Sequence, residues 1–215
     1  MAKIKTRERI LDTGLALFNE FGEPNITTNH IADEMDISPG NLYYHFRNKE
    51  EIIRTLYPRF GDAVRGALAL PDDREITAQD VGRYHVAGIE AIWEFRFLTR
   101  DPIDLVVRDP AMAEPTSGLN VWLIDWFVTL FERLIAQGHM RRPEPAGDLV
   151  LVATNAVILW SSWLDFVMTS RSKADVEQSD VAEGALQSFL SFVPYLDAAF
   201  AAQVRTVLEE RAARS

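Results

Sequence analysis

The chain has 215 residues, enough for one or two small domains with a core, and 47% of them are hydrophobic. Cysteine is absent, which excludes disulfides, thiolate metal sites and cysteine nucleophiles. The net charge of −10 argues against binding nucleic acid by bulk electrostatics. The first 60 residues contribute only −1 of this charge, because eight Lys or Arg offset nine Asp or Glu.

The N-terminal residues are basic and have no apolar stretch of the kind found in signal peptides. The longest apolar run, residues 149–168, contains Asn155 and Asp165, and a charge inside a membrane-spanning helix is costly. We therefore expect a buried helix of a cytoplasmic protein rather than a membrane span.

Helical periodicity predicts a first helix from about Lys5 to Phe21, ended by Gly22. The basic residues at its start either lie along a phosphate backbone or form a solvated end. Its inward stripe consists of Ile10, Gly14, Leu17 and Phe21, with Leu11 and Phe18 beside them.

Two short helices with a tight corner between them are predicted next. The first begins at Thr27 or Thr28, whose hydroxyl can cap free N–H groups. Asp36 stands at the corner and tolerates a left-handed backbone, and Ser38 caps the second helix with Pro39 at its first position. The residues that point inward are Ile31, Ala32 and Met35 on the first helix and Leu42 and Phe46 on the second.

The outer face of the second helix lacks long aliphatic side chains and suits a polar groove. Two helices crossing at a short turn form a helix-turn-helix, whose second helix enters the DNA major groove. The alternative is an ordinary helical hairpin with a polar surface. The outer residues are Gly40, Asn41, Tyr43, Tyr44 and His45.

Residues 7–56 resemble the DNA-binding head of the tetracycline-repressor (TetR) family of bacterial regulators. The chain departs from the family at the corner, where Met35-Asp36 replaces the usual Ala-Gly, and Asn41 occupies a position that varies in the family. The matching residues are Ile10, Phe18, Phe21-Gly22, Thr27-Thr28, Ile31-Ala32, Ile37-Ser38, Gly40, Leu42-Tyr43-Tyr44-His45-Phe46 and Lys49-Glu50.

The resemblance, together with side-chain chemistry, implies roles in DNA binding. Four donors, Thr28, Tyr43, His45 and Lys49, would hold phosphates, which set the register on DNA without reading sequence. Asn41 could pair with an adenine, Pro39 or Tyr44 could touch a thymine methyl, and Gly40 allows close approach. His30 is expected to be solvated. The predicted DNA-binding residues are Thr28, Ser38, Pro39, Gly40, Asn41, Tyr43, Tyr44, His45 and Lys49.

A fourth helix is predicted from residue 49 to about 70, with Asn48 and Glu51 resembling a capping box. Pro58 lies inside it and either bends it in a way that serves signalling or is simply tolerated. We expect a DNA-binding domain at residues 1–48. Residues 49–215 would form a helical effector-binding and dimerisation domain, with helix 49–70 as the connector.

The rest of the chain is expected to be all-α, giving about nine to ten helices in total. No run shows strand alternation, and a polar loop is expected at 170–178. The predicted helices span residues 77–98, 102–107, 116–137, 143–169 and a last segment from about 180 to 211 that Pro194 interrupts.

Aromatic residues recur at helical spacing on three of these helices. They form either a filled core or the wall of a pocket for a lipophilic ligand, and the family resemblance implies an effector cavity. Phe127 is one of these aromatic residues, and Asp165 is one of the polar residues that could orient a ligand in such a pocket. The predicted effector-binding residues are Trp93, Arg96, Phe97, Trp122, Asp125, Trp126, Asn155, Trp160 and Trp163.

The helices at about 147–169 and 180–211 have apolar residues on nearly two faces, which is typical of helices with partners on both sides. The resemblance implies that they form a homodimer interface. A two-fold dimer would also place two recognition helices on half-sites one helical turn of DNA apart.

The sequence thus predicts a ligand-responsive dimeric regulator that represses transcription and leaves double-stranded operator DNA when it binds a small lipophilic effector. The alternatives are an all-helical carrier or enzyme for a hydrophobic molecule, and a regulator controlled by a protein partner. We expect no catalytic residues, metal site or cofactor, because His85 and His139 are isolated and no catalytic set or phosphate loop is recognisable.

Overall fold

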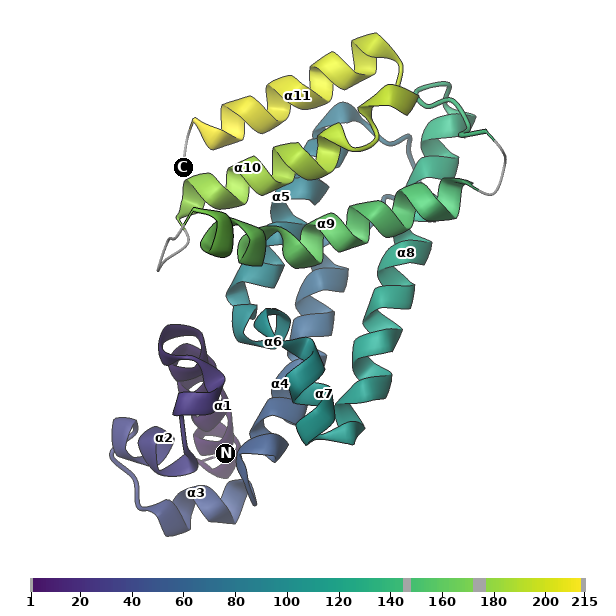
Figure 1. Cartoon of the computed structure of the whole chain (residues 1–215). Helices are drawn as coiled ribbons and strands as arrows, with labels where there is room; N and C mark the ends of the chain where they lie inside the picture. The colour runs from purple at the N-terminus through teal and green to yellow at the C-terminus, as the bar shows by residue number, and fades with distance from the viewer. Residues whose placement is uncertain (1, 145–147, 172–176, 214–215) are drawn as a thin grey trace. The chain divides into compact units, whose positions relative to one another are not determined.

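The computed structural model describes residues 2–144, 148–171 and 177–213 (Figure 1). These residues form eleven α-helices, α1–α11, and three short 3₁₀ helices, η1–η3, and none of them lies in a β-strand. The expected all-α fold is confirmed. The helix number is slightly higher than expected because short helices form on both sides of proline residues.

Contacts divide the chain into two compact units. The first unit is Met1–Asp62 with Phe95–Thr116, and the second is Ala63–Glu94 with Ser117–Ser215. The segment from Phe95 to Thr116 thus packs with the N-terminal helices rather than with the residues that flank it in sequence. Whether residues 1–48 fold as an independent domain stays a prediction.

The first unit is built on three N-terminal helices around a small apolar core. Phe21, which we expected to face inward, is instead 52% exposed, because α1 ends there and its side chain passes the edge of the core. The core residues Ile10, Leu11, Phe18, Ile31, Leu42 and Phe46 are at most 1% exposed. The elements are α1 (Ala2–Phe21), η1 (Glu23–Asn25), α2 (Thr28–Glu34), α3 (Pro39–His45), the first part of α4 (Lys49–Ala67), α6 (Arg96–Arg100), α7 (Pro102–Arg108) and η2 (Pro110–Met112).

Local signals set the corner between α2 and α3, as predicted. The backbone N–H of His30 donates to the Thr27 hydroxyl at 3.3 Å, and that of Asn41 donates to the Ser38 hydroxyl at 3.2 Å. These two bonds cap the helices. Asp36 has a φ of 53°, so it adopts the left-handed conformation that the turn requires.

Helix α4 begins after Asn48, whose side chain accepts a hydrogen bond from the backbone N–H of Glu51 at 2.9 Å. The return bond of the expected capping box goes instead from the N–H of Arg47 to Glu51 Oε2, at 2.7 Å. Pro58 lies inside the helix, as expected, and the helix ends at Ala67 rather than near residue 70.

The second unit places α10 against α5, α9 and α11 (Figure 1). The helix expected at 77–98 ends at Glu94. The helix predicted from residue 143 is α9, which starts at Asp148; Pro143 and Glu144 are not helical, and residues 145–147 fall outside the described residues. The elements are the end of α4, α5 (Ala78–Glu94), α8 (Ala113–Ala136, mostly here), α9 (Asp148–Ser170), α10 (Gln178–Leu190), η3 (Val193–Tyr195) and α11 (Ala198–Ala212).

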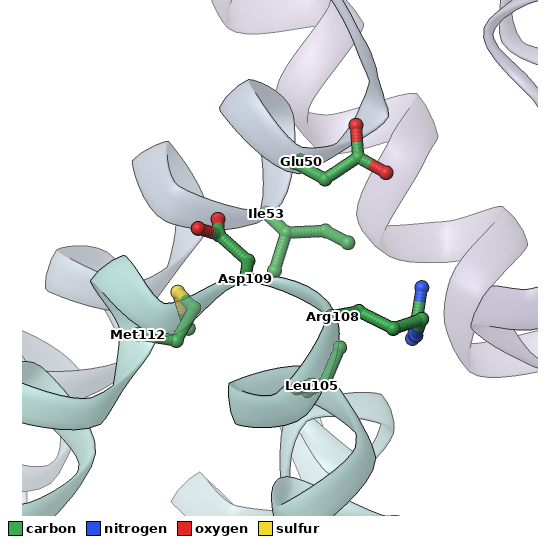
Figure 2. Close-up of a pocket in the computed structure, with 6 residues that line it drawn as sticks. All are labelled: Glu50, Ile53, Leu105, Arg108, Asp109 and Met112. Atoms are coloured by element: carbon green, nitrogen blue, oxygen red, sulfur yellow. The ribbon is translucent and has the colours of Figure 1, made fainter.

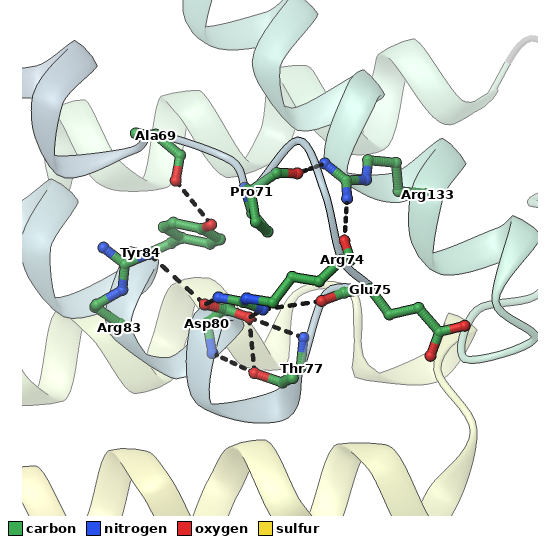
Figure 3. Close-up of polar contacts among 9 residues, drawn as sticks. All are labelled: Ala69, Pro71, Arg74, Glu75, Thr77, Asp80, Arg83, Tyr84 and Arg133. Carbon is green, nitrogen blue, oxygen red and sulfur yellow. Dashed lines mark hydrogen bonds and ion pairs between the residues drawn. The ribbon is translucent and has the colours of Figure 1, made fainter.

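A buried carboxylate fixes the start of α5 (Figure 3). Asp80, 5% exposed, accepts hydrogen bonds from Arg74 at 2.5 and 2.8 Å and from the Thr77 hydroxyl at 2.7 Å. Because the hydrogen bond from Arg74 outweighs the effect of burial, the pKa of Asp80 lies well below its usual value. Arg133 donates to the carbonyls of Pro71 and Arg74, so the loop before α5 is held at several points.

Candidate nucleic-acid interface

The outer face of α3 is open to solvent. Tyr43 is 50% exposed and Tyr44 67%, although large aromatic side chains are usually buried. The predicted contacts Ser38, Pro39, Gly40 and Asn41 are also exposed, and His45 is half-buried. A helix with this composition, held at a fixed turn to α2, can enter a groove and present polar and aromatic groups to base edges.

Three of the four predicted phosphate-binding residues, Thr28, Tyr43 and Lys49, line one hollow beside this face, and His45 does not. The hydroxyls of Thr28 on α2 and Tyr43 on α3 are hydrogen-bonded at 3.0 Å. They line a hollow of about 240 Å³ together with Arg47 and Lys49. Hydroxyl and cationic donors around a hollow of this kind can hold a phosphate oxygen. The full lining is Pro24, Ile26, Thr27, Thr28, Tyr43, Arg47, Asn48 and Lys49.

Lys49 has a second neighbour that the sequence analysis missed. Its ammonium lies 2.8 Å from Glu23 Oε1, and the same carboxylate is bound by Arg108 of α7. The Lys49 side chain is 17% exposed, so it is partly withdrawn from solvent. The only local sign of this cluster was an acidic residue in the loop after α1, since Arg108 is distant in sequence.

The predicted effector-binding residues fall into both units. Phe97 belongs to the first unit, where its ring lies 5.1 Å from that of Phe18 and its N–H donates to Asn19. Arg96 is in the same short helix, α6. These two residues therefore do not line the core of the second unit, because the helix that was expected to carry them there ends at Glu94.

Within the second unit, four of the remaining residues do not provide free polar groups to a pocket. Asp125 and Asn155 are exposed on the surfaces of α8 and α9. The indole N–H of Trp126 donates to the carbonyl of Leu68 at 2.6 Å, and that of Trp163 donates to the carbonyl of Asp180 at 2.8 Å. Trp93 and Trp122 are half-buried, and Arg65 lies over the Trp122 ring at 5.5 Å.

The centre of the second unit is an aromatic cluster around His85, which the sequence analysis treated as isolated. The imidazole of His85 is 1% exposed and lies 5.7 Å from the ring of Trp160 and 5.2 Å from that of Phe192. Neither of its nitrogens has a hydrogen-bond partner among the described residues, and the same holds for Trp160 Nε1 and Ser188 Oγ. Burial lowers the pKa of His85 to about 3, so its ring is neutral.

The described residues contain no group of three His, Cys, Asp or Glu side chains that could hold a metal ion. The exposed face of α3 and the hollow beside it present hydroxyl, aromatic and cationic groups to solvent. These features place the protein in the class of helix-turn-helix DNA-binding proteins with a helical body.

Comparison with known families agrees with this class. The family described as bacterial regulatory proteins, tetR family, matches residues 10–60. The family described as bacterial transcriptional repressor matches residues 59–204. The chain belongs to the TetR family of bacterial transcriptional regulators, and it is a DNA-binding regulator related to repressors.

A solved structure of a TetR-family regulator from Marinobacter aquaeolei VT8 is similar over 95% of this chain and 98% of its own, with 33% identity and a TM-score of 0.85. The probable acrEF/envCD operon repressor of Escherichia coli K12 is 33% identical over 54 residues. The regulator TtgW of Pseudomonas putida, named as uncharacterized, is 35% identical over 90 residues. The chain spans 24% of the length of the Escherichia coli relative and 56% of that of TtgW.

Proposed function

We propose that this protein is a homodimeric cytoplasmic repressor that leaves its operator when a small lipophilic effector binds the second unit. The observation that carries the DNA-binding part is the exposed face of α3, where Tyr43 and Tyr44 are at least half exposed and Tyr43 lines the hollow. A packed structural helix would bury such aromatic side chains. The nine predicted DNA-binding residues, from Thr28 to Lys49, remain proposals residue by residue.

A second copy of the chain is the proposed cover for the outer face of α9. Val150, Leu151, Ile158 and Phe166 are each more than half exposed, although the opposite face of the helix is buried. Monomeric proteins rarely expose so many apolar side chains along one helix. The outward residues of α11 are polar, including Gln203 and Glu209, so we place the interface on α9 and α10 rather than on the whole of 180–211.

Helix α9 also has the length and apolar composition of a membrane span, and within the described residues it alone does so. In its most apolar window 44% of the residues are buried, and core helices of soluble proteins have the same properties. A dimer interface would account for the remaining apolar face.

The effector site is proposed at the cluster of His85 and Trp160, whose ring nitrogens are buried without partners among the described residues. Buried polar groups normally find partners, and leaving one unpaired costs about 1–3 kcal/mol. A ligand with an aromatic or aliphatic body and one neutral hydrogen-bonding group would supply the missing partner and stack among the rings. The neutral state of His85 favours an uncharged group over an anion.

The proposal is tested by a gel shift with DNA that flanks the gene, comparing wild type with Tyr44→Ala. The expected result is a specific shift that Tyr44→Ala weakens about tenfold or more, as loss of a base or backbone contact does. Ile103→Ala is the matched control, because Ile103 is 75% exposed in the same unit but lies outside the helix-turn-helix.

Dimerisation and effector response need separate measurements. Sedimentation should show a dimer that Phe166→Glu and Ile158→Glu convert to monomer. A screen of neutral lipophilic compounds should identify ligands that abolish the shift in wild type. A wild-type protein that is folded and dimeric but binds no duplex selected from random-sequence DNA would contradict the repressor function. Release by a protein and by no small molecule would favour the protein-partner alternative.

A further inference from the structure

Glu23 is a buried carboxylate with two cationic partners. Its side chain is 4% exposed, and a charge at this depth is stable only when opposite charges and hydrogen bonds replace water. Burial by itself raises the pKa of Glu23, but the hydrogen bonds from Arg108 and Lys49 outweigh burial and the pKa falls below its usual value. Glu23 is therefore ionised at neutral pH and attracts both cations.

The two cations hold Glu23 in different ways. Arg108 places Nη1 3.1 Å from Oε1 and Nη2 2.5 Å from Oε2, and its Nε donates to Asp104 at 2.7 Å. The Lys49 ammonium lies 2.8 Å from Oε1 and donates to the backbone carbonyl of Glu23 at 2.9 Å. A planar guanidinium that binds both carboxylate oxygens satisfies the anion by itself. Lys49 can therefore leave Glu23 without stranding a buried charge, as long as Arg108 stays.

Lys49 also lines the hollow in which a DNA phosphate is proposed to bind. Thr28 and Tyr43, both with hydroxyls, line the same hollow. The ammonium of Lys49 thus has two alternative anions, the carboxylate of Glu23 and a phosphate. The ammonium has three donors around one compact charge, so its attraction to a phosphate is strongest when another cation neutralises the carboxylate of Glu23.

The position of Arg108 depends on how α7 is held on α4. Next to it, Asp109 forms an ion pair with Arg54 of α4 at 2.5 Å. Figure 2 shows Arg108 and Asp109 pointing in different directions from the end of α7, close to Glu50 and Ile53 of α4. The space left between these residues is about 10 Å³, room for about one water molecule. Arg108 is therefore seated on a closely packed contact within the first unit.

We propose that Arg108 is a positioning residue for operator binding: by holding the carboxylate of Glu23, it releases Lys49 to a DNA phosphate. If α7 carries Arg108 away from Glu23, the buried carboxylate retains Lys49, and the protein loses one phosphate contact in each head. This inference rests on the proposed role of Lys49 in DNA binding. It adds a residue outside the helix-turn-helix that decides whether that contact forms.

The test is the salt dependence of DNA binding for Arg108→Gln, Lys49→Gln and the double variant. The probe is a duplex selected from random-sequence DNA with the wild-type protein. The logarithm of the binding constant K falls linearly with log salt, and each lost phosphate contact reduces the magnitude of this slope by about 0.9. Lys49→Gln and Arg108→Gln should each lower the slope by this amount per head and weaken binding about tenfold near physiological salt. The double variant should resemble either single variant.

Two further variants separate positioning from loss of charge or of folding. Arg59→Gln also removes an ion-paired cation of the first unit, the partner of Glu8 and Asp12, but it leaves the contacts of α7 in place and should leave the slope unchanged. Glu23→Gln combined with Arg108→Gln should restore the wild-type slope, because a neutral amide does not retain Lys49. The double variant with Glu23→Gln and Arg108→Gln also buries no unpaired charge, so it should fold even if Arg108→Gln alone does not.

Additive effects of Arg108→Gln and Lys49→Gln would overturn the inference. So would a wild-type slope in Arg108→Gln, or a low slope in the Glu23→Gln, Arg108→Gln pair. These outcomes leave the proposed function intact, provided that wild type binds its duplex and an effector releases it. Failure of wild type to bind any duplex would instead contradict the proposed function itself.

Discussion

The two units of the molecule bury polar groups in opposite ways. In the first unit, Glu23 is charged and has two cations on its carboxylate. In the second unit, His85 is neutral, and neither of its nitrogens has a partner among the described residues. A paired charge stabilises the fold and can exchange partners, whereas an unpaired neutral group lowers stability until something binds it. This difference agrees with the two proposals, an exchange of partners at Glu23 and an effector site at His85.

The packing of the aromatic cluster gives the largest expected effect. Trp160 is 1% exposed, and a Cβ added at Gly88 would lie 2.5 Å from its ring, so the indole fills its space closely. Trp160→Ala should lower the free energy of unfolding by about 3–5 kcal/mol, measured by urea denaturation. Trp122→Ala, at a half-buried indole, is the control and should cost clearly less. Equal losses would mean that the cluster is not the core of the second unit.

Removal of the buried carboxylate in the first unit should destabilise the protein. Glu23→Ala removes the carboxylate that Lys49 and Arg108 share and leaves Arg108 with Asp104, although both cations can reach water. The expected loss is about 1–3 kcal/mol of unfolding free energy. Asp104→Ala is the control, since Asp104 pairs with Arg108 but its side chain is 45% exposed. A gain in stability for Glu23→Ala would remove the contrast between the units.

Removal of the unpaired imidazole in the second unit should have the opposite sign. His85→Leu replaces an unsatisfied polar ring by an apolar side chain and should raise the free energy of unfolding by about 1 kcal/mol at pH 7. The same variant should bind the effector more weakly. Phe192→Leu, which changes a neighbouring ring and no polar group, is the control and should be destabilising.

His85 and Glu23 should also affect the stability of the fold in different pH ranges. The folded-state pKa of His85, about 3, lies below the ordinary value of 6.5, so below pH 6.5 the unfolded chain binds a proton that the folded chain does not. Stability should fall as the pH is lowered from about 6.5 to 5, and His85→Leu should remove this loss. The pKa of Glu23 is also lowered, so the stability that its ionised form contributes should be lost only below about pH 4.5. Melting temperatures from pH 7.5 to 4 test both statements.

The smallest expected effect lies at the hollow beside α3. Thr28→Val removes the hydroxyl that is hydrogen-bonded to Tyr43 at 3.0 Å and keeps the shape of the side chain. DNA binding should weaken by about fivefold, close to 1 kcal/mol, with little change in stability. Thr206→Val, on the outer face of α11, should leave DNA binding unchanged. An unchanged affinity in Thr28→Val would separate the hollow from the DNA-binding surface.

The sequence by itself determined the helix-turn-helix and the all-α class. The relevant signals are local. The hydroxyls of Thr27 and Ser38 each accept a hydrogen bond from the backbone N–H three residues later, and Asp36 adopts the left-handed conformation that the turn requires. Inward residues at helical spacing, such as Leu42 and Phe46, follow from the geometry of one helix. Such features do not depend on which distant segment packs against them.

The tertiary structure decided what periodicity does not encode. Arg108 meets Glu23 across 85 residues of sequence, and the break after Glu94 places Phe97 against Phe18 rather than in the second unit. His85 looked isolated in the sequence, because its aromatic neighbours come from α8, α9 and the segment after α10. Local patterns specify which face of a helix is apolar, but the choice of partner for a buried charge or ring depends on which faces meet after folding.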